Sequence, residues 1–300
     1  AQLYLLRLDG GEAERLTKTP MPASSPKWTA DGKRIVFVSS VLGESLESTE
    51  AELARREKEE RTRVKATVTE SRLVRYWDRW LEVDEWSHLF SLDLSTRKVT
   101  DLTPGMKRLG RLDEGLAFDV ARDGSVVFAA NSTPQPYRTL NSDLFLVPPG
   151  GGAPRNLTAD NPAEDSSPVF SPDGATIAYG RERLGDGFPD RTRLALLDVA
   201  SGKTTVLTEE WDLVPEGWSF TRDGKTLVFR AEARARTNVY ALPVAGGTPR
   251  LVWQGGRATA AEVAGSGEVV FGYTTFRRPV ELAAVKLDGS GFRDLTAWND

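Results

Sequence analysis

The sequence predicts an all-β fold, a β-propeller built from four-stranded blades. Three observations carry this prediction: a unit of about fifty residues recurs along the chain, most units contain an Asp-Gly turn between two apolar strands, and most end in Leu-Thr. A repeat of this length, made of short strands, is typical of propeller blades. A β-sandwich of two domains would also show short strands and frequent turns, but it would not repeat one turn type at a fixed place in each unit.

The inner pair of strands in each unit is predicted from its turn. The turns fall at Asp31-Gly32, Asp123-Gly124, Asp173-Gly174 and Asp223-Gly224, with a degenerate fifth at Ser266-Gly267. Each aspartate follows an apolar residue by three positions (Trp28, Val120, Phe170, Phe220) and precedes an aromatic residue by five or six (Phe37, Phe128, Tyr179, Phe229). Because glycine accepts the positive φ of a tight hairpin turn, each site predicts a β-hairpin.

An outer pair of strands is predicted after each hairpin. Its first strands fall at 3–8, 89–94, 144–148, 194–199, 239–244 and 281–287. Its second strands follow a polar or glycine-rich turn and end at Thr17, Thr103, Thr158, Thr208, Trp253 or Thr296. Six repeats are therefore visible, and the first is incomplete because no inner pair precedes it. We expect six to seven blades in the whole domain.

Repeats that stack into one radial body predict a single domain over residues 1–300, truncated at its N-terminus. The net charge of -4 provides no basic face for nucleic acid. No apolar run reaches the roughly eighteen residues of a membrane span, and no signal peptide is recognisable. The absence of cysteine excludes disulfides without choosing a compartment, and we favour the cytoplasm over the periplasm or secretion.

A charged helical insertion is predicted at about 44–70, where the connection between Phe37 and His88 is about thirty residues longer than its counterparts. Acidic residues precede basic ones by four positions at Glu52 and Arg56, at Glu57 and Arg61, and at Glu59 and Arg63. This order stabilises a helix. The helix is either a solvated element on the rim of the propeller or an arm that reaches a partner domain or overhangs an active site.

A cluster of aromatic and charged residues follows the insertion. Its members are Arg75, Tyr76, Trp77, Asp78, Arg79, Trp80, Glu82, Asp84 and Glu85, with Trp86 directly after them. They would form a wall that holds the backbone and termini of a peptide. Alternatively, the aromatic side chains only seat the insertion against its blade.

No catalytic residue, metal site or cofactor site is predicted within the chain. His88 is the only histidine, and its place in a predicted strand favours a structural role over that of a general base. Gly217-Trp218-Ser219 begins like a hydrolase nucleophile elbow but lacks the second glycine. Asp186 and Asp190 could supply oxygen ligands to calcium, yet their spacing fits no EF-hand loop, and a surface turn explains them.

With these residues in view, the chain resembles the N-terminal propeller of the prolyl oligopeptidase family of serine peptidases, especially the bacterial branch akin to dipeptidyl-peptidase V and acylaminoacyl peptidase. The resemblance covers nearly the whole chain. Its most specific stretches are Arg75 to Trp80 running into His88-Leu89-Phe90, and Asn141-Ser142-Asp143-Leu144-Phe145; others are Pro168 to Gly174, Gly187 to Arg191 and Leu295 to Asp300.

The resemblance implies an α/β-hydrolase domain after residue 300 that carries the catalytic serine, acid and histidine. The propeller would then cap that active site and admit only short peptides, as in a dipeptidyl- or acylaminoacyl-type peptidase. Some relatives bind the amino terminus of the peptide with acidic residues of a propeller insertion, which makes Glu82, Asp84 and Glu85 the candidates. The partners implied are short peptides and the hydrolase domain of the same polypeptide; assembly into a homo-oligomer stays open.

Two other classes of function are compatible with a propeller. A TolB-like propeller would serve as a non-catalytic scaffold for protein partners. A self-contained propeller enzyme, such as a lactonase or glycosidase, would need inward carboxylates or metal ligands at the channel, whereas the regularly spaced aspartates here fall in the turns.

Overall fold

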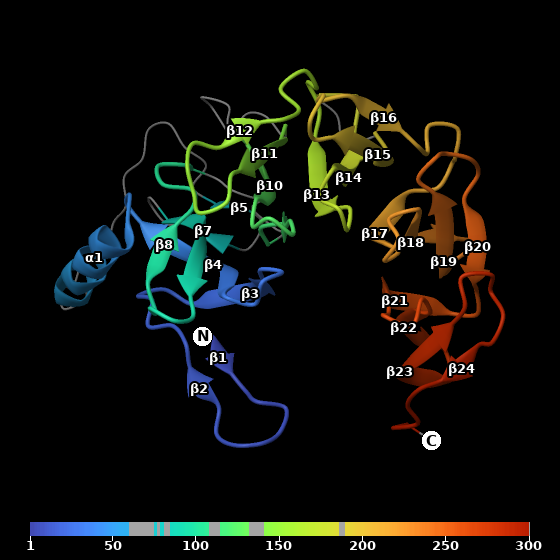
Figure 1. Ribbon diagram of the computed structural model, residues 1–300, viewed down its shortest axis with the longest axis horizontal. Helices are drawn as coiled ribbons and strands as arrows, with labels where there is room; N and C mark the ends of the chain where they lie inside the picture. Colours follow the sequence, from blue (N-terminus) through green and yellow to red (C-terminus); the bar gives the residue numbers. More distant parts are fainter. Residues whose placement is uncertain are drawn as a thin grey trace. The chain divides into compact units, whose positions relative to one another are not determined.

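The computed structural model describes residues 1–59, 75–76, 79–80, 85–107, 115–131, 141–185 and 190–299. The chain forms two compact units, Ala1–Asn161 and Pro162–Asp300. Each unit is a series of antiparallel sheets, and the described part of the chain contains one helix, α1 (Leu46–Glu59) (Figure 1). No helix among the described residues is long and apolar enough to cross a membrane.

The first unit holds one two-stranded and two four-stranded sheets, besides a short hairpin in the insertion. The two-stranded sheet pairs β1 (Tyr4–Leu5) with β2 (Glu14–Arg15). The next sheet contains β3 (Ala23–Trp28), β4 (Arg34–Leu42), β7 (Glu85–Asp93) and β8 (Val99–Asp101) in that order. The last contains β9 (Phe118–Val120), β10 (Val126–Ala130), β11 (Asp143–Val147) and β12 (Arg155–Asn156). The hairpin joins β5 (Arg75–Tyr76) to β6 (Arg79–Trp80).

The second unit repeats the four-stranded pattern three times. The first sheet contains β13 (Asp165–Phe170), β14 (Thr176–Arg181), β15 (Arg193–Asp198) and β16 (Thr204–Val206). The second contains β17 (Pro215–Phe220), β18 (Thr226–Ala233), β19 (Arg236–Pro243) and β20 (Arg250–Trp253). The third contains β21 (Arg257–Val263), β22 (Val269–Thr275), β23 (Arg278–Val285) and β24 (Arg293–Asp294), and one parallel bridge between Thr237 and Arg257 links it to the second.

The predicted hairpins are confirmed, and three of their turns share one hydrogen-bond pattern. Asp31 accepts the hydroxyl of Thr29 at 2.6 Å and the backbone N–H of Lys33 at 3.0 Å. Gly32 lies between them with φ of 66°. Asp173 and Asp223 accept equivalent hydroxyl and N–H donors in their own turns. The aspartate therefore closes the turn with its side chain, and the glycine supplies the backbone conformation.

The recurrent Leu-Thr ending has an equally regular role. The N–H of Leu89, on β7, donates to the hydroxyl oxygen of Thr103 at 3.1 Å, and the N–H of Leu102 donates back to the carbonyl of Leu89 at 2.8 Å. The same bond, between residues fourteen apart, joins Leu3 to Thr17, Leu144 to Thr158, Leu194 to Thr208, and Leu282 to Thr296. The threonine thus extends the pairing of the outer two strands past the last ladder bond.

Within each unit, neighbouring sheets pack face to face through apolar layers. One layer of the first unit joins Val36 and Leu89 of the β3–β8 sheet to Phe128 and Phe145 of the β9–β12 sheet. In the second unit, Leu194 on β15 and Phe229 on β18 belong to a similar layer. Phe37, Phe128, Tyr179 and Phe229, the aromatic residues predicted to follow each turn, are all fully buried. The middle sheet of the second unit has both faces covered, and it needs apolar residues at consecutive positions, as at Leu227, Val228 and Phe229 on β18.

Candidate functional site

The predicted peptide-holding wall begins with the β5–β6 hairpin, in which Arg75 pairs with Trp80 and Tyr76 pairs with Arg79. Arg75 is exposed. Trp77, Asp78, Glu82 and Asp84 lie outside the described residues. Glu85 is exposed at the start of β7, opposite Leu42 at the end of β4. The grouping of these side chains into one wall stays a prediction.

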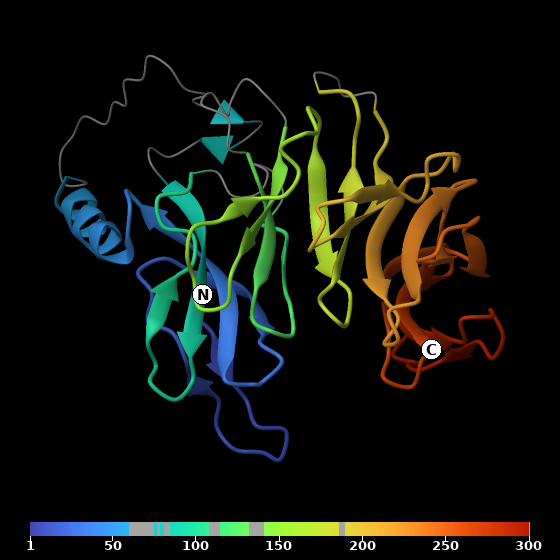
Figure 2. The same cartoon turned by 45° about the horizontal axis from the view of Figure 1, so that its top comes forward.

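The base of the insertion is a long two-stranded extension of its sheet. The ladder between β4 and β7 runs without interruption from Arg34 paired with Asp93 to Leu42 paired with Glu85. Helix α1 follows directly and lies to one side of this sheet (Figures 1 and 2). The two strands therefore carry both ends of the insertion, and their outer ends stay packed, because Val41 and Leu42 are buried.

The start of α1 is hydrogen-bonded to the end of β4. The Ser45 hydroxyl accepts the N–H of Ser48, which is the role of a helix N-cap. Thr49 is fully buried; its hydroxyl accepts the N–H of Leu42 at 2.8 Å and donates to the carbonyl of Ser45 at 2.7 Å. The Ser48 hydroxyl donates to the carbonyl of Leu42 at 2.9 Å, so two neighbouring side chains, Ser48 and the buried Thr49, join the strand to the helix.

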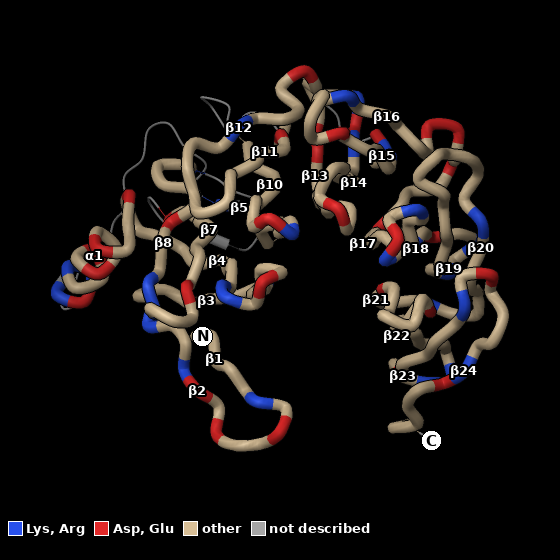
Figure 3. Tube along the Cα trace, viewed as in Figure 1, with Lys and Arg blue, Asp and Glu red and all other residues tan. Residues whose placement is uncertain are grey.

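The charged face of α1 agrees in part with the predicted ion pairs. Glu52 pairs with Arg56 at 2.9 Å, as predicted, and also with Arg55 at 2.6 Å. These hydrogen bonds, that of Arg55 first, lower the pKa of Glu52 to about 2. Acidic and basic residues follow one another along the helix (Figure 3). The partners predicted for Glu57 and Glu59, which are Arg61 and Arg63, lie outside the described residues.

In five of the six sheets of the repeat, one polar residue occupies a position that the sequence analysis missed. It directly precedes the leucine of each Leu-Thr bond, and its members are Gln2, His88, Asp143, Arg193 and Glu281. All but Gln2 are buried. In the sheet that carries the insertion, this is the end from which the insertion emerges. A polar residue followed by leucine, with threonine fourteen positions after that leucine, is the signal that could have identified the set.

His88 fills this position in the second sheet and is only 1% exposed. Its Nε2 lies 2.9 Å from the carbonyl oxygen of Met106, and its Nδ1 lies 2.7 Å from a carboxylate oxygen of Asp101. Because a carbonyl can only accept, Nε2 carries a hydrogen and donates it. Both ring nitrogens are engaged, so His88 joins β7 to β8 and to the segment after β8, as the structural role predicted for it requires.

Arg193 fills the same position in the fourth sheet and lies in a buried ion network. It pairs with Asp190 at 3.0 Å and with Glu209 at 3.3 Å. Burial would raise the pKa of Asp190, but hydrogen bonds from the N–H of Arg183, the guanidinium of Arg193 and other N–H groups outweigh it and lower that pKa to about 2. These donors occupy the Asp190 carboxylate, and Asp186, the other predicted calcium ligand, lies outside the described residues.

The neighbouring Arg191 holds the following turn. Its guanidinium donates to the carbonyl oxygens of Thr208 at 3.2 Å, Trp211 at 2.6 Å and Glu209. The predicted Gly-Phe-Pro-Asp-Arg stretch thus ends in two residues, Asp190 and Arg191, that connect the loop before β15 to the turn after β16. Ser219 lies on β17, as predicted, and not at a strand-to-helix turn. No group of three or more metal-ligating side chains occurs among the residues described.

Comparisons with known proteins include dipeptidyl-peptidases 5 of bacterial and fungal origin, at low identity. No family model matches the chain. Dipeptidyl-peptidase 5 of Porphyromonas gingivalis is 25% identical over 305 residues, which cover 85% of this chain and 44% of that protein. Dipeptidyl-peptidase 5 of Aspergillus fumigatus is 27% identical over 207 residues, covering 59% of this chain and 28% of that protein. The chain therefore spans less than half the length of these relatives.

Solved structures show that the fold is a β-propeller. The match to the β-propeller domain of the Trilobed protease from Pyrococcus furiosus covers all of this chain and 74% of that domain's chain, with a TM-score of 0.64 and 16% identity. The match to Pyrococcus horikoshii acylaminoacyl peptidase covers 99% of this chain and 42% of the peptidase chain, with a TM-score of 0.69 and 14% identity. The match to TolB from Acinetobacter baumannii covers 99% of this chain and 60% of the TolB chain, with a TM-score of 0.59 and 16% identity. The chain is thus a propeller related at low identity to prolyl oligopeptidase family peptidases, and TolB propellers are similar to it as well.

Proposed function

We propose that the chain is the substrate-gating cap of a serine peptidase that hydrolyses short peptides, of the dipeptidyl- or acylaminoacyl-peptidase type. The observation that carries this proposal is the 25% identity to dipeptidyl-peptidase 5 of P. gingivalis over 85% of the chain. In the proposed protein, an α/β-hydrolase domain follows residue 300 and supplies the nucleophile, acid and histidine. The propeller, as one domain, restricts access to that active site and orients the peptide beside the nucleophile, which lowers the entropic part of the barrier.

The proposed peptide contacts come from the end of the insertion. Glu82, Asp84 and Glu85 would pair with the free amino group of the substrate, while the tryptophans and arginines from Arg75 to Trp80 would flank its backbone. The position of Glu85 at the outer end of the long β4–β7 ladder supports this assignment, because its side chain is exposed there. An ammonium group that meets a carboxylate gains a charge-assisted hydrogen bond, and a blocked amino group loses it.

The test of the proposal is the intact mass of the natural gene product, combined with labelling by a fluorophosphonate that reacts with activated serines. We expect a product about twice the 32.9 kDa of this chain that takes up one label. An unlabelled product of nearly this mass would refute the peptidase assignment.

The peptide contacts are tested in that full-length enzyme. Charge reversal at Glu82, Asp84 and Glu85 together should raise KM for peptides with a free amino terminus at least about tenfold, the equivalent of one charge-assisted hydrogen bond. N-acetylated peptides should be less affected. The matched control is reversal of Glu57, an exposed residue on α1. Unchanged KM and kcat in the triple variant would remove these residues from the site.

A second candidate function is that of a non-catalytic scaffold for protein partners. It is favoured by the TM-score of 0.59 to TolB from A. baumannii over 99% of this chain. The labelling experiment separates the two candidates, because a scaffold has no activated serine.

A further inference from the structure

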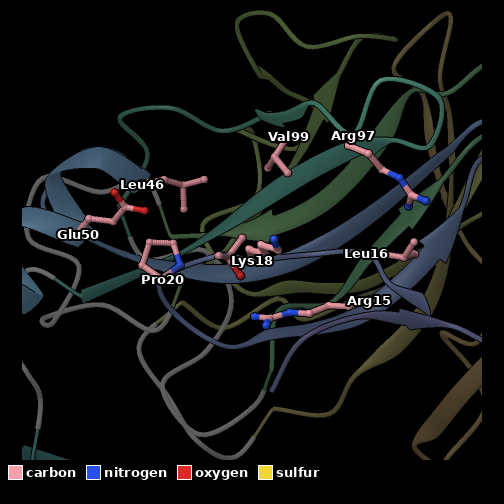
Figure 4. A pocket seen from close by; sticks show the side chains of 9 residues that line it. Arg15, Leu16, Lys18, Pro20, Leu46, Glu50, Arg97 and Val99 are labelled. Atoms are coloured by element: carbon pink, nitrogen blue, oxygen red, sulfur yellow. The ribbon is translucent and has the colours of Figure 1, made fainter. Parts of the chain in front are cut away.

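A pocket of about 480 Å³ lies between β2, β8 and the first turn of α1. Its lining residues are Arg15, Leu16, Lys18, Thr19, Pro20, Leu46, Glu50, Arg97 and Val99 (Figure 4). All of them belong to the first unit and to described residues. The volume is within the range of roughly 300–1,000 Å³ that holds small ligands.

The walls of this pocket carry charges of both signs that do not pair with one another. Glu50 and Leu46 are one helical turn apart on α1, while Arg15 and Lys18 come from β2 and the segment after it (Figure 4). Among the described residues, neither the Lys18 nor the Glu50 side chain has a hydrogen-bond or ion-pair partner. Arg15 uses its Nε to donate to the carbonyl of Thr17 at 2.8 Å, which leaves its two terminal nitrogens for a ligand.

The rest of the lining limits what the ligand can be. Leu16, Pro20 and Val99 join Leu46 in an apolar surface, which suits a hydrocarbon side chain. The third cation, Arg97, is already paired with Glu14. The unpaired groups are therefore two cations and one carboxylate beside an apolar surface, which match an anionic group, a cationic group and an apolar body in one molecule.

We propose that this pocket binds a zwitterionic peptide of two or three residues. The terminal carboxylate lies against Arg15 and Lys18, the free amino group donates to Glu50, and an apolar side chain packs on Leu46, Pro20 and Val99. Arginine suits the carboxylate because its planar fork makes two parallel hydrogen bonds. This site requires no catalytic domain, so it does not rest on the proposed function.

The experiment is a calorimetric titration of the chain with the dipeptide Ala-Leu, with N-acetyl-Ala-Leu and with Ala-Leu amide. We expect saturable binding of Ala-Leu at one site, and each blocking group should weaken it at least about tenfold, since each removes one charge-assisted hydrogen bond. Lys18→Ala and Arg15→Ala should weaken Ala-Leu binding by a similar factor. Glu50→Gln should weaken binding of Ala-Leu but leave that of N-acetyl-Ala-Leu unchanged.

Lys33→Ala and Glu57→Gln are matched controls, because both residues are exposed and neither lines the pocket. Retained affinity in these controls supports the assignment. Absence of saturable binding by Ala-Leu overturns it. Equal affinity for the three compounds also overturns it. Binding that depends on the carboxylate of the ligand alone overturns it as well, and would indicate that the pocket binds an acidic segment of a partner protein instead. A far-ultraviolet circular dichroism spectrum identical to that of the unmodified chain shows that each variant is folded.

Discussion

Individual polar residues are placed with regularity in this chain, and His88 shows what such a residue does. Its buried ring donates from Nε2 to the Met106 carbonyl and faces the Asp101 carboxylate through Nδ1. Asp101 in turn accepts the N–H of Thr103 at 2.9 Å with its other oxygen. The histidine, the aspartate and the Leu-Thr bond therefore form one connected hydrogen-bond network. Removing one member leaves its neighbours in the network with one partner fewer.

His88→Leu should lower the free energy of unfolding by about 1–3 kcal/mol, because it leaves the Met106 carbonyl without its donor and the Asp101 carboxylate without the imidazole beside it. Urea denaturation measures this change. Asp101→Asn keeps an oxygen that accepts the N–H of Thr103. The double variant His88→Leu/Asp101→Asn should lose less free energy of unfolding than the sum of the losses in the two single variants. Additivity within about 0.5 kcal/mol would show that the two side chains are not coupled.

At the scale of the strand pair, the Leu-Thr hydrogen bond is the repeated contact that joins the outer two strands of a sheet at one end. Thr158 is fully buried, and its hydroxyl oxygen accepts the N–H of Leu144 at 3.0 Å. A hydroxyl at this place satisfies a backbone donor that the short strand β12 does not reach. The same reasoning explains why the signature recurs as Thr and not as Val, which has a similar shape.

Thr158→Val should lower the free energy of unfolding by about 1–3 kcal/mol, since the buried N–H of Leu144 loses its acceptor while the side-chain volume hardly changes. Thr205→Val is the control, because Thr205 is exposed on β16. Urea denaturation of both variants provides the measurement, and equal stabilities would contradict the role assigned to the threonine hydroxyl.

The insertion depends on a comparable bond at Thr49. Thr49→Val removes the acceptor of the Leu42 N–H and the donor to the Ser45 carbonyl. We expect amide hydrogen exchange over 43–59 to accelerate at least about tenfold, which corresponds to a local loss of about 1.4 kcal/mol. Exchange in β14 and β15, in the other unit, should stay unchanged. Glu57→Gln on the same helix is the control, and uniform acceleration across the chain would refute a local effect.

At the scale of the whole molecule, several carboxylates are ionised more readily than usual. The Thr296 hydroxyl, with further donors from Asn299, lowers the pKa of Glu281 from 4.5 to about 2. The network around Asp190 lowers that pKa from 3.8 to about 2. A pKa that is lower in the folded state means that the ionised form stabilises the fold. This stabilisation is complete above the unfolded pKa values, near 4, and is lost as the pH falls towards 2.

We therefore expect the free energy of unfolding to fall steeply between about pH 4.5 and pH 2 and to change little between pH 5 and pH 7. Urea titrations at fixed pH values measure this profile. Asp190→Asn should reduce the slope below pH 4, because the carboxylate that titrates is gone, and it should lower the stability at pH 7 by about 2–3 kcal/mol. A variant with an unchanged acid slope would show that Asp190 does not contribute to it.

The sequence by itself determined the repeat: the hairpins, the outer strand pairs and the start of the insertion helix are all present where they were predicted. These features depend on short-range rules, because turn chemistry, side-chain alternation and i,i+4 pairing act within a few residues. The family resemblance followed from the same local stretches, and comparison with dipeptidyl-peptidase 5 supports it. The aromatic wall from Arg75 to Glu85 stays a prediction.

Only the tertiary structure decided which distant residues meet. It joined His88 to Asp101, brought Arg15 and Glu50 into one pocket, and placed a polar residue at the same end of five sheets. It also shows bulges in the first strands, where Ser25 and Ser167, each before a proline, adopt φ of 51°. Such contacts and backbone choices depend on strand register and on sheet packing, which sum the interactions of many residues far apart in the chain, and no local pattern contains that information.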